Sequence, residues 1–354
     1  MTTNNVAKII KKRINGNDKR LKEMIDEMER LYPEGSMSQS PREDFVPVLV
    51  LAYLRSGSSF TADIIQQAKG SFYVFEPLRN LLDREKIKST ASCNDTEFMS
   101  MECREPSTIN FIIDQITKFY RCDYKVSFLV PDPHQGGSEN QIFYANCLRA
   151  TRQKPGYCFQ LMRRICYKSS VRIIKTIRLS VDLTKMLLEN IPNLKIIHLI
   201  RDPRAVVGSR QTGDFMKKTN LYLLSPKELC MRYEKDIAAA KEVERIWPTG
   251  IRRIHYEDLA TDPHKISRGI YEFLGLRYLP GMTKWIEQHT SARSAYSYYG
   301  TLRTKSSEMI NKWKKTLPNS LIHEADQVCA SFYKSVNNFY KTFATLNRSM
   351  SKPN

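Results

Sequence analysis

Five short apolar runs alternate with helix-forming segments along this chain, and that alternation limits the fold more than any other feature of the sequence. Most of the runs are continuously apolar, which indicates strands buried on both faces. Strands of that kind, separated by helices, predict an α/β fold with a central parallel sheet flanked by helices on both faces. The runs are VPVLVLAYL from Val46, SFYVFEP from Ser71, VRIIKTIRL from Val171, NLKIIHLIRD from Asn193 and GIRRIHYEDLA from Gly250.

The sequence divides into an N-terminal segment, one ordered domain and a tail. Residues 1–44 are charged and end in the turn-rich stretch YPEGSMSQSPRED, which predicts a helix followed by a linker. The ordered domain is expected over residues 45–345, and residues 346–354 are expected to form the tail. Its middle region, 85–168, has weak periodicity and is expected to form loops and helices over the sheet. A helix is expected at Ser59–Lys69, with Gly70 ending it. Further helices are expected at Leu183–Asn190, from Pro203, from Pro226 to about Trp247, and from Pro263 to Gly275.

Basic residues outnumber acidic ones, 56 against 37, and the resulting net charge of +19 predicts an anionic partner. The candidates are a nucleic acid, an acidic polysaccharide, a phosphate-bearing cofactor and a membrane surface. The basic residues are spread along the chain without a Lys/Arg block or a nucleic-acid-binding motif, so we expect no nucleic-acid partner.

The sequence has no segment with the length and apolarity of a membrane-spanning helix. Its longest apolar run, Phe45–Leu54, has about half of the roughly 20 residues required and is better explained as a buried strand. The polar N-terminus lacks the features of a signal peptide. Taken alone, these two observations predict a cytosolic protein.

The cysteines favour a different compartment. Six of the eight lie between Cys93 and Cys166, at irregular spacing and without the paired pattern of metal ligands. Such a distribution is typical of disulfides formed in an oxidising compartment, with free buried thiols in a cytosolic protein as the alternative. Two glycosylation sequons, at Asn94 and Asn347, agree with secretion. We expect no metal site.

The first run leads into the loop LRSGSSF, which has the composition of an anion-binding turn. A loop between a buried strand and a helix N-terminus attracts anions, because the helix end carries unsatisfied N–H groups and a partial positive charge. Gly57 allows the backbone to curl, Ser56, Ser58 and Ser59 offer hydroxyls, and Arg55 adds a cation. The lysine that follows the last glycine of a nucleotide-binding P-loop is missing. The alternative is a purely structural, capped turn.

The fourth run leads into RDPRAVVGSR, a second candidate anion site. Arg201 lies at the carboxyl end of a strand, where open α/β sheets bind ligands, and Ser209 follows two helical turns later. An arginine and a hydroxyl on one side of a helix can bind a phosphate monoester. Alternatively, Arg201 and Asp202 form a local ion pair and Ser209 is only solvated.

Together, the two motifs resemble the cofactor signatures of sulfotransferases that use 3′-phosphoadenosine 5′-phosphosulfate (PAPS). RSGSSF resembles the 5′-phosphosulfate loop, and RDPRAVVGS resembles the 3′-phosphate element. The series YLRSGSSF, FEPL, IKTIRL, LKIIHLIRDPRAVVGSR and YEDLA is most similar to the Golgi carbohydrate 6-O-sulfotransferases. The resemblance covers residues from about 45 to 340. It implies a P-loop-like sulfotransferase fold, sulfuryl transfer from PAPS to a sugar hydroxyl, an acceptor glycan that can itself be anionic, and no metal.

The resemblance also assigns site residues. Arg55, which replaces the lysine of cytosolic sulfotransferases, would hold the 5′ end of PAPS with Ser56, Gly57, Ser58 and Ser59. Arg201 and Ser209 would hold the 3′-phosphate. Arg303, in LRTKSSEMINKW, would add a C-terminal contact, with a solvated helix start as the alternative. The family is typically anchored by an N-terminal membrane helix, which this sequence does not show: either it is a lumenal fragment or an incomplete gene model, or this member lacks the anchor. The cysteines and sequons favour the Golgi lumen over the cytoplasm.

The catalytic base is harder to assign, because the histidine that many cytosolic members carry after the third strand is replaced by Ile177. Glu76, at the end of the second strand, resembles the glutamate of the family's YEP segment and is the best candidate; otherwise it pairs with Arg79 or Arg55. Lys175 and Arg178 would stabilise the transferred group or an acidic acceptor, or else are simply cationic strand ends. Two other functions remain open for the chain as a whole. One is a P-loop kinase, which the missing lysine disfavours, and the other is a non-catalytic glycan-binding protein.

The other polar residues near these motifs are expected to be structural. His198 and His255 lie within apolar strands and are expected to be buried core histidines. Tyr256, Glu257 and Asp258 match a family element that we interpret as structural.

Overall fold

The chain folds around a five-stranded, all-parallel sheet with the strand order β2-β3-β1-β4-β5. The computed structural model describes residues 19–34, 44–84, 104–131, 137–152, 154–211, 225–292, 300–337 and 339–340. The predicted α/β class and parallel sheet are confirmed. The strands are β1 Val46–Leu51, β2 Ser71–Phe75, β3 Val171–Thr176, β4 Lys195–Ile200 and β5 Ile251–His255.

The fifth strand is shorter than predicted. It ends at His255, and Tyr256–Thr261 forms the helix α12 in place of the strand end expected there. Glu257 and Asp258 fall in the first turn of this helix, where carboxylates interact favourably with the helix dipole. Tyr256 is thereby placed at the carboxyl edge of the sheet.

Strand order creates a crevice beside β1. This central strand pairs with β3 from Val46↔Val171 to Leu51↔Thr176, and with β4 on its other side. The chain moves to one side of β1 to form β2 and β3, then crosses to the other side for β4 and β5. In parallel sheets, ligands bind outside the carboxyl ends of strands where this direction reverses. The loops after β1 and β4 meet there.

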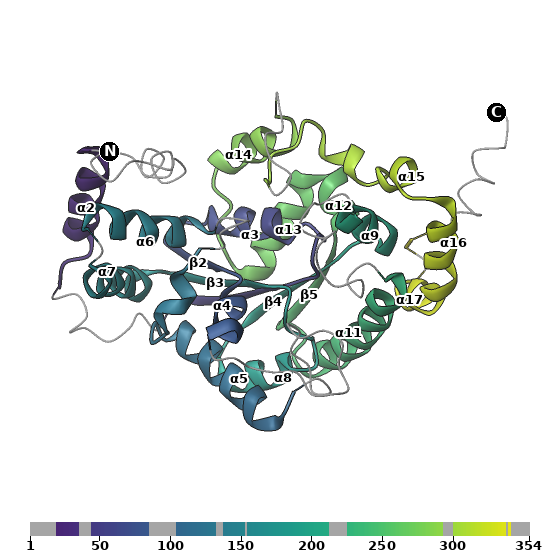
Figure 1. Ribbon diagram of the computed structural model, residues 1–354, viewed down its shortest axis with the longest axis horizontal. Helices are drawn as coiled ribbons and strands as arrows, with labels where there is room; N and C mark the ends of the chain where they lie inside the picture. The colour runs from purple at the N-terminus through teal and green to yellow at the C-terminus, as the bar shows by residue number, and fades with distance from the viewer. Residues whose placement is uncertain are drawn as a thin grey trace.

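Helices cover both faces of the sheet (Figure 1). One face packs against α3, α12, α13 and α14, and its core includes Val48 and Val50 of β1. The opposite face packs against α4, α5, α8 and part of α11, with Leu49 and Leu51 pointing into that core. The bounds are α3 Ser58–Gln66, α4 Pro77–Arg84, α5 Pro106–Tyr120, α8 Thr184–Asn190, α11 Pro226–Ile246, α13 Pro263–Leu274 and α14 Gly281–Thr290.

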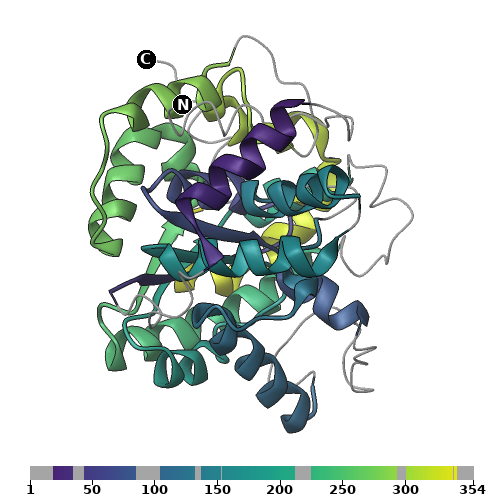
Figure 2. The ribbon, with the colours of Figure 1, turned by 90° about the vertical axis from the view of Figure 1, so that its left-hand side faces the viewer.

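Two further groups of helices lie at the ends of the sheet. Helices α2, α6 and α7 lie beside β2 and face the viewer in Figure 2, while α9 and α15–α17 form a third core with α11 at the other end. The described part of the middle region, 104–131, 137–152 and 154–168, contains both helices and loops, as expected. These elements are α2 Lys19–Leu31, η2 Val126–Leu129, α6 Glu139–Ala150, α7 Pro155–Lys168, α9 Pro203–Gln211, η4 Ser306–Met309, α15 Trp313–Thr316, α16 Asn319–Val328 and α17 Ala330–Ser335.

The helix boundaries follow local chemistry. Ser225 and Asp262 cap α11 and α13, accepting hydrogen bonds from Glu228 N and Lys265 N. Gly275 ends α13 at φ 67°. Helix α3 ends at Gln66, earlier than the predicted Lys69, because Gln67 and Ala68 close it with i→i−3 bonds.

The outer edge of β2 is closed by side chains that precede and begin α6. Asn140 accepts from Tyr73 N at 2.8 Å, and Ser138 donates to Tyr73 O at 2.5 Å. Gln141 accepts from Phe75 N and donates to Phe75 O, both at 3.0 Å. These bonds replace a neighbouring strand and satisfy backbone groups that would otherwise be exposed at a sheet edge.

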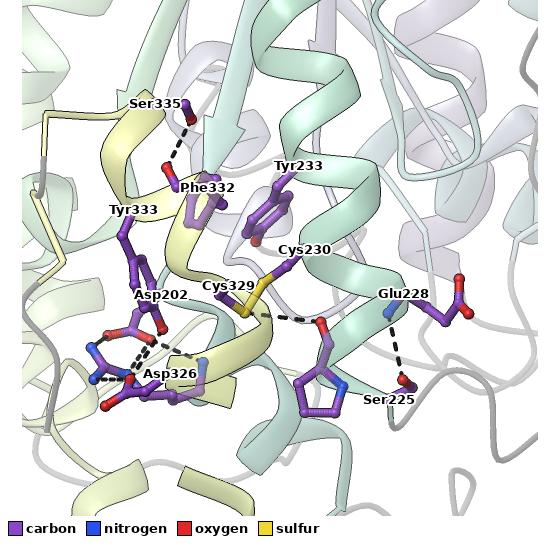
Figure 3. The surroundings of a disulfide bond; sticks show 12 residues. Asp202, Ser225, Glu228, Cys230, Tyr233, Asp326, Cys329, Phe332, Tyr333 and Ser335 are labelled. Carbon is purple, nitrogen blue, oxygen red and sulfur yellow. Dashed lines mark hydrogen bonds and ion pairs between the residues drawn. A yellow bond between two sulfur atoms is a disulfide. The ribbon is translucent and has the colours of Figure 1, made fainter. Parts of the chain in front are cut away.

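Three disulfides join the helices, which confirms the prediction for six of the eight cysteines. They are Cys122–Cys166, Cys147–Cys158 and Cys230–Cys329. Figure 3 shows the last of these, which links α11 to the end of α16. Cys93, Cys103 and both sequons lie outside the described residues. In the described part of the chain, every helix is too short or too polar to cross a membrane.

Candidate functional site

The loop after β1 has a backbone shape that few residues could adopt. Arg55 and Gly57 have φ angles of 71° and 96°. A Cβ at position 57 would lie 2.4 Å from the Tyr256 ring, so only glycine fits there. Gly57 also caps α3 without any side-chain hydrogen bond to the helix N–H groups. Those N–H groups therefore face the crevice, where an anion would be stabilised.

The serines of this loop differ in their roles. Ser56 is fully buried; its hydroxyl donates to Tyr53 O at 2.7 Å and accepts from Tyr53 N at 3.2 Å. It shapes the turn and does not line the crevice. Ser58 and Ser59 begin α3 and line the crevice, as the sequence predicts.

The two predicted anion motifs are in direct contact, although they are about 150 residues apart. Arg55 Nε donates to Ser209 Oγ at 3.1 Å. Arg201 donates from Nη1 to Arg55 O and from Nη2 to Met309 O, both at 3.0 Å. The Arg201 guanidinium also lies over the Tyr256 ring, 4.2 Å from its centre. The alternative of an Arg201–Asp202 ion pair is wrong: Asp202 pairs with Arg204 instead.

Arg201 has N–H groups beyond the two that bond Arg55 O and Met309 O. Its Nε is buried and has no hydrogen-bond partner among the described residues. Leaving a buried charged donor unsatisfied is costly, and such groups usually receive a ligand or water. The residues present therefore fit a phosphate group bound between Arg201, Ser209 and Arg55.

A cavity of about 310 Å³ opens at this point. Seven of the eight donor-binding residues predicted from the sequence line it, Ser56 being the exception, and Lys175 lines it as well. Arg303 is held there by its own turn, donating to Gly300 O at 2.6 Å and Leu302 O at 2.7 Å. Sequence reasoning missed several lining residues, chiefly the aromatic ones: Phe60, Tyr256, His289 and Trp313.

The missed residues differ in how they could have been found. Phe60 follows the predicted serines directly, and Tyr256 stands at the carboxyl end of a predicted strand, so their positions carried a usable indication. His289 comes from α14, which no motif marks. Trp313 begins α15 and is the last residue of LRTKSSEMINKW, the segment that the resemblance connects with donor binding, but no role was assigned to it.

Glu76 lies in a buried cluster of charges. Its Oε1 accepts from Lys175 Nζ at 2.5 Å and its Oε2 from Arg178 Nη1 at 2.6 Å. Its predicted structural partners were Arg79 and Arg55, whereas the structure pairs it with the two cations of β3 and the segment after it. Burial alone would raise the pKa of Glu76, but Lys175 and Arg178 overcome that effect and hold the pKa below its ordinary value.

Lys175 connects this cluster of charges with the cavity. Glu76 is only 4% exposed and does not itself line the cavity, but Lys175 lies in both. The backbone of Glu76 has a φ of 48°, and its N–H donates to Lys175 O at 2.9 Å. A carboxylate and two cations are thus held at the end of the same crevice.

Of the residues expected to be structural, His198 and Glu257 are buried and hydrogen-bonded, whereas His255, expected in the core, is only half-buried and Asp258 is exposed. His198 is fully buried, bonds Tyr53 Oη through Nε2 at 2.9 Å, and has its pKa lowered to about 3 by burial. Glu257 accepts from Asp202 N at 3.0 Å and supports the loop after β4; burial raises its pKa to about 7. His255 bonds Tyr340 Oη at 2.9 Å. Tyr256 is the exception, because it lines the cavity.

Curated relatives match most of the chain. Carbohydrate sulfotransferase 1 from Rattus norvegicus is 27% identical, covering 85% of this chain and 81% of that protein. Carbohydrate sulfotransferase 5 from Homo sapiens is also 27% identical, covering 84% and 78%. Among solved structures, the sulfotransferase domain from the curacin biosynthetic pathway is 12% identical with a TM-score of 0.45, covering 82% of this chain and 98% of that chain. The family model described as "Sulfotransferase family" matches residues 47–280, well over half of the sequence. This chain therefore belongs to the sulfotransferase family.

Proposed function

We propose that this protein transfers a sulfuryl group from PAPS to a hydroxyl of a sugar in a glycan. The junction of Arg55, Arg201 and Ser209 carries the proposal, because it joins the phosphosulfate loop and the 3′-phosphate element at one cavity. The relatives named carbohydrate sulfotransferases support a sugar as the acceptor. The resemblance to 6-O-sulfotransferases favours the 6-hydroxyl, and the net charge of +19 fits an acidic glycan.

The donor would be held by two groups of residues. The α3 N-terminus, with Arg55, Gly57, Ser58 and Ser59, would bind the 5′-phosphosulfate, while Ser56 acts through the shape of the turn. Arg201, Ser209 and Arg303 would bind the 3′-phosphate. Rings at the cavity wall offer apolar surface for the adenine base; these are Phe60, Tyr256 and Trp313.

The transfer itself needs a proton acceptor and charge stabilisation. The sugar hydroxyl attacks the sulfur, its O–S bond forms as the S–O bond to the phosphate breaks, and PAP leaves with the electron pair. The hydroxyl proton passes by way of Lys175, which lines the cavity, to Glu76 Oε1 behind it. Protonation weakens its ion pair with Lys175, whose ammonium then stabilises the oxygens of the transferred group. Arg55 offsets the charge that develops on the leaving phosphate.

We also propose that the protein works in the Golgi lumen. Disulfides persist in the oxidising secretory compartments and are rare in the cytosol. Three of them, among the described residues, tie together helices at the two ends of the sheet, which supports synthesis in such a compartment. Free thiols at these six cysteines in native protein from cells would contradict this assignment.

The decisive experiment compares three ligands on the same protein. Thermal stabilisation is measured with PAP, with ATP·Mg²⁺ and with heparin, because a ligand that binds only the native state raises the melting temperature. Preferential stabilisation by PAP is expected, followed by sulfuryl transfer from labelled PAPS to members of a glycan panel. Equal or stronger stabilisation by ATP·Mg²⁺ would support a phosphotransferase, and a response to heparin alone a glycan-binding protein.

A further inference from the structure

Helix α11 contacts all three segments that form the candidate site. Helix α11 lies below the sheet in Figure 1. Of its residues, Tyr233 and Asp236 are buried and Arg232 is half-buried. None of the three lines the cavity described above. Their hydrogen bonds nevertheless run to the loop after β1, the segment after β3 and the loop after β4.

Two of these residues fix the segment that follows β3. Arg232 Nη2 donates to Ile177 O at 2.8 Å, and Asp236 Oδ1 accepts from Val181 N at 2.8 Å. The two contacts lie on either side of Arg178, the residue that binds Glu76 Oε2. The position of the Glu76 cluster is therefore tied to α11.

The same pair holds the loop after β1 through Tyr53. The Tyr53 hydroxyl donates to Asp236 Oδ2 at 2.7 Å, and the Arg232 guanidinium lies 4.7 Å from the centre of the Tyr53 ring. Tyr53 in turn shapes the phosphosulfate loop through its two bonds with Ser56. Asp236 thus accepts one hydrogen bond from each half of the site.

Tyr233 provides the third connection. Its hydroxyl donates to Arg201 O at 2.9 Å, and its ring packs edge-on against Tyr53, with centroids 4.2 Å apart. Residues of one helix, α11, therefore hydrogen-bond to all three segments that form the site.

Packing alone does not require this polar arrangement. Asp236 is 2% exposed and Tyr53 is fully buried, and burial raises the pKa of Asp236 to about 6. Burying an ionised carboxylate costs several kcal/mol before its contacts are counted, and well-packed apolar residues often stabilise a fold as well or better. The Asp236 carboxylate, in contrast, accepts from two donors, Tyr53 Oη and Val181 N, and so fixes the distance between them.

We propose that Tyr53, Arg232 and Asp236 are positioning residues that set the separation between the donor loop and the Glu76–Lys175–Arg178 cluster. This inference rests on the proposed function. Small errors in the placement of reacting groups lower the rate of a reaction on the order of ten- to a hundredfold, even when each ligand still binds. Loss of these contacts should therefore reduce transfer more than donor binding.

The test uses Tyr53→Phe and Asp236→Asn, which keep the shapes of the side chains. For each variant, kcat, the KM for PAPS, the Kd of PAP and the melting temperature are measured. We expect kcat to fall at least about tenfold while the Kd of PAP stays within about twofold of wild type. Tyr53→Phe retains both ring contacts, so it keeps the test valid if Asp236→Asn folds poorly.

Val243→Ala is the matched control. Val243 is also buried in α11, but it packs in the core on the face of the sheet that α4, α5 and α8 cover. It should lower the melting temperature and leave kcat per PAP-binding site unchanged. If the wild type is active and kcat is unchanged in both Tyr53→Phe and Asp236→Asn, the positioning role is overturned. Parallel losses of kcat, PAP binding and stability would overturn it as well. A wild type that neither binds PAP nor transfers a sulfuryl group would overturn the proposed function and this inference with it.

Discussion

Two residues of the site, Arg55 and Glu76, adopt the left-handed φ region although neither is glycine. Such conformations cost about 1–3 kcal/mol each and persist only where the surroundings hold them. Arg201 holds the first by bonding the Arg55 carbonyl, and the Lys175 carbonyl holds the second by accepting from Glu76 N. At the residue scale, the charged groups are therefore fixed in place by the fold itself.

Gly57→Ala should weaken PAP binding at least about tenfold, because the new Cβ would meet the Tyr256 ring at 2.4 Å and force a strained φ of 96°. Calorimetric titration with PAP measures the effect. Gly269→Ala is the control: a Cβ there meets no atom within 4 Å, and alanine stabilises a helix by about 0.5–1 kcal/mol. Gly57→Ala with wild-type affinity would contradict the assigned loop.

Glu76→Gln should lower kcat about a hundredfold or more, as expected for loss of a general base, with the Kd of PAP nearly unchanged. The pH profile provides a second check. Because Lys175 and Arg178 hold the pKa of Glu76 below its ordinary value, the carboxylate remains ionised, and its ion pairs remain intact, throughout the range above that value. Wild-type kcat should therefore be lost through Glu76 only when the pH falls below the ordinary glutamate range. Full activity of the glutamine variant would remove Glu76 as the base.

At the scale of elements, the start of α9 depends on the C-terminal helices. Arg204 is 1% exposed; it donates to Asp202 at 2.7 Å and to Asp326 of α16 at 2.9 Å, and it lies 4.2 Å from the centre of the Trp313 ring. Figure 3 labels the two carboxylates, Asp202 and Asp326, which lie close together beside Tyr333. One side chain thereby joins the 3′-phosphate element to a wall of the cavity.

Arg204→Met should destabilise the protein by about 3–5 kcal/mol, because it leaves the buried Asp202 and the partly buried Asp326 without their cation. Urea denaturation measures the change. The exposed pair Lys305–Glu308 offers the comparison: Lys305→Ala should change the free energy of unfolding by less than about 1 kcal/mol. Similar values for the two variants would show that the Arg204 network contributes little.

For the whole molecule, the sequence predicted what local chemistry decides. The apolar runs predicted all five strands of the sheet, and the two loop motifs named five residues that line the cavity: Gly57, Ser58, Ser59, Arg201 and Ser209. Contacts between distant segments left no local pattern. Strand order and helix packing decide such contacts, and sequence periodicity does not encode either. Examples are the pairing of Glu76 with Lys175, the hydrogen bonds of α11 to three loops and the position of Trp313.

The disulfides provide a prediction at this scale, because they span very different lengths of chain. Cys230 and Cys329 are 99 residues apart and tie α11 to the C-terminal helices, whereas Cys147 and Cys158 are 11 residues apart within the α6–α7 hairpin. In the loop-entropy view, closing the longer loop stabilises the fold by about 5 kcal/mol and the shorter by about 3 kcal/mol.

Replacing Cys230 and Cys329 by alanine should therefore lower the free energy of unfolding by roughly 2 kcal/mol more than replacing Cys147 and Cys158. Because the longer bridge also secures the helices around Arg204 and Trp313, PAP binding should weaken only in the first variant. Denaturation and PAP titration of both double variants measure the two effects. If PAP affinity fell equally in both, the disulfides would support the fold in general and not the cavity wall.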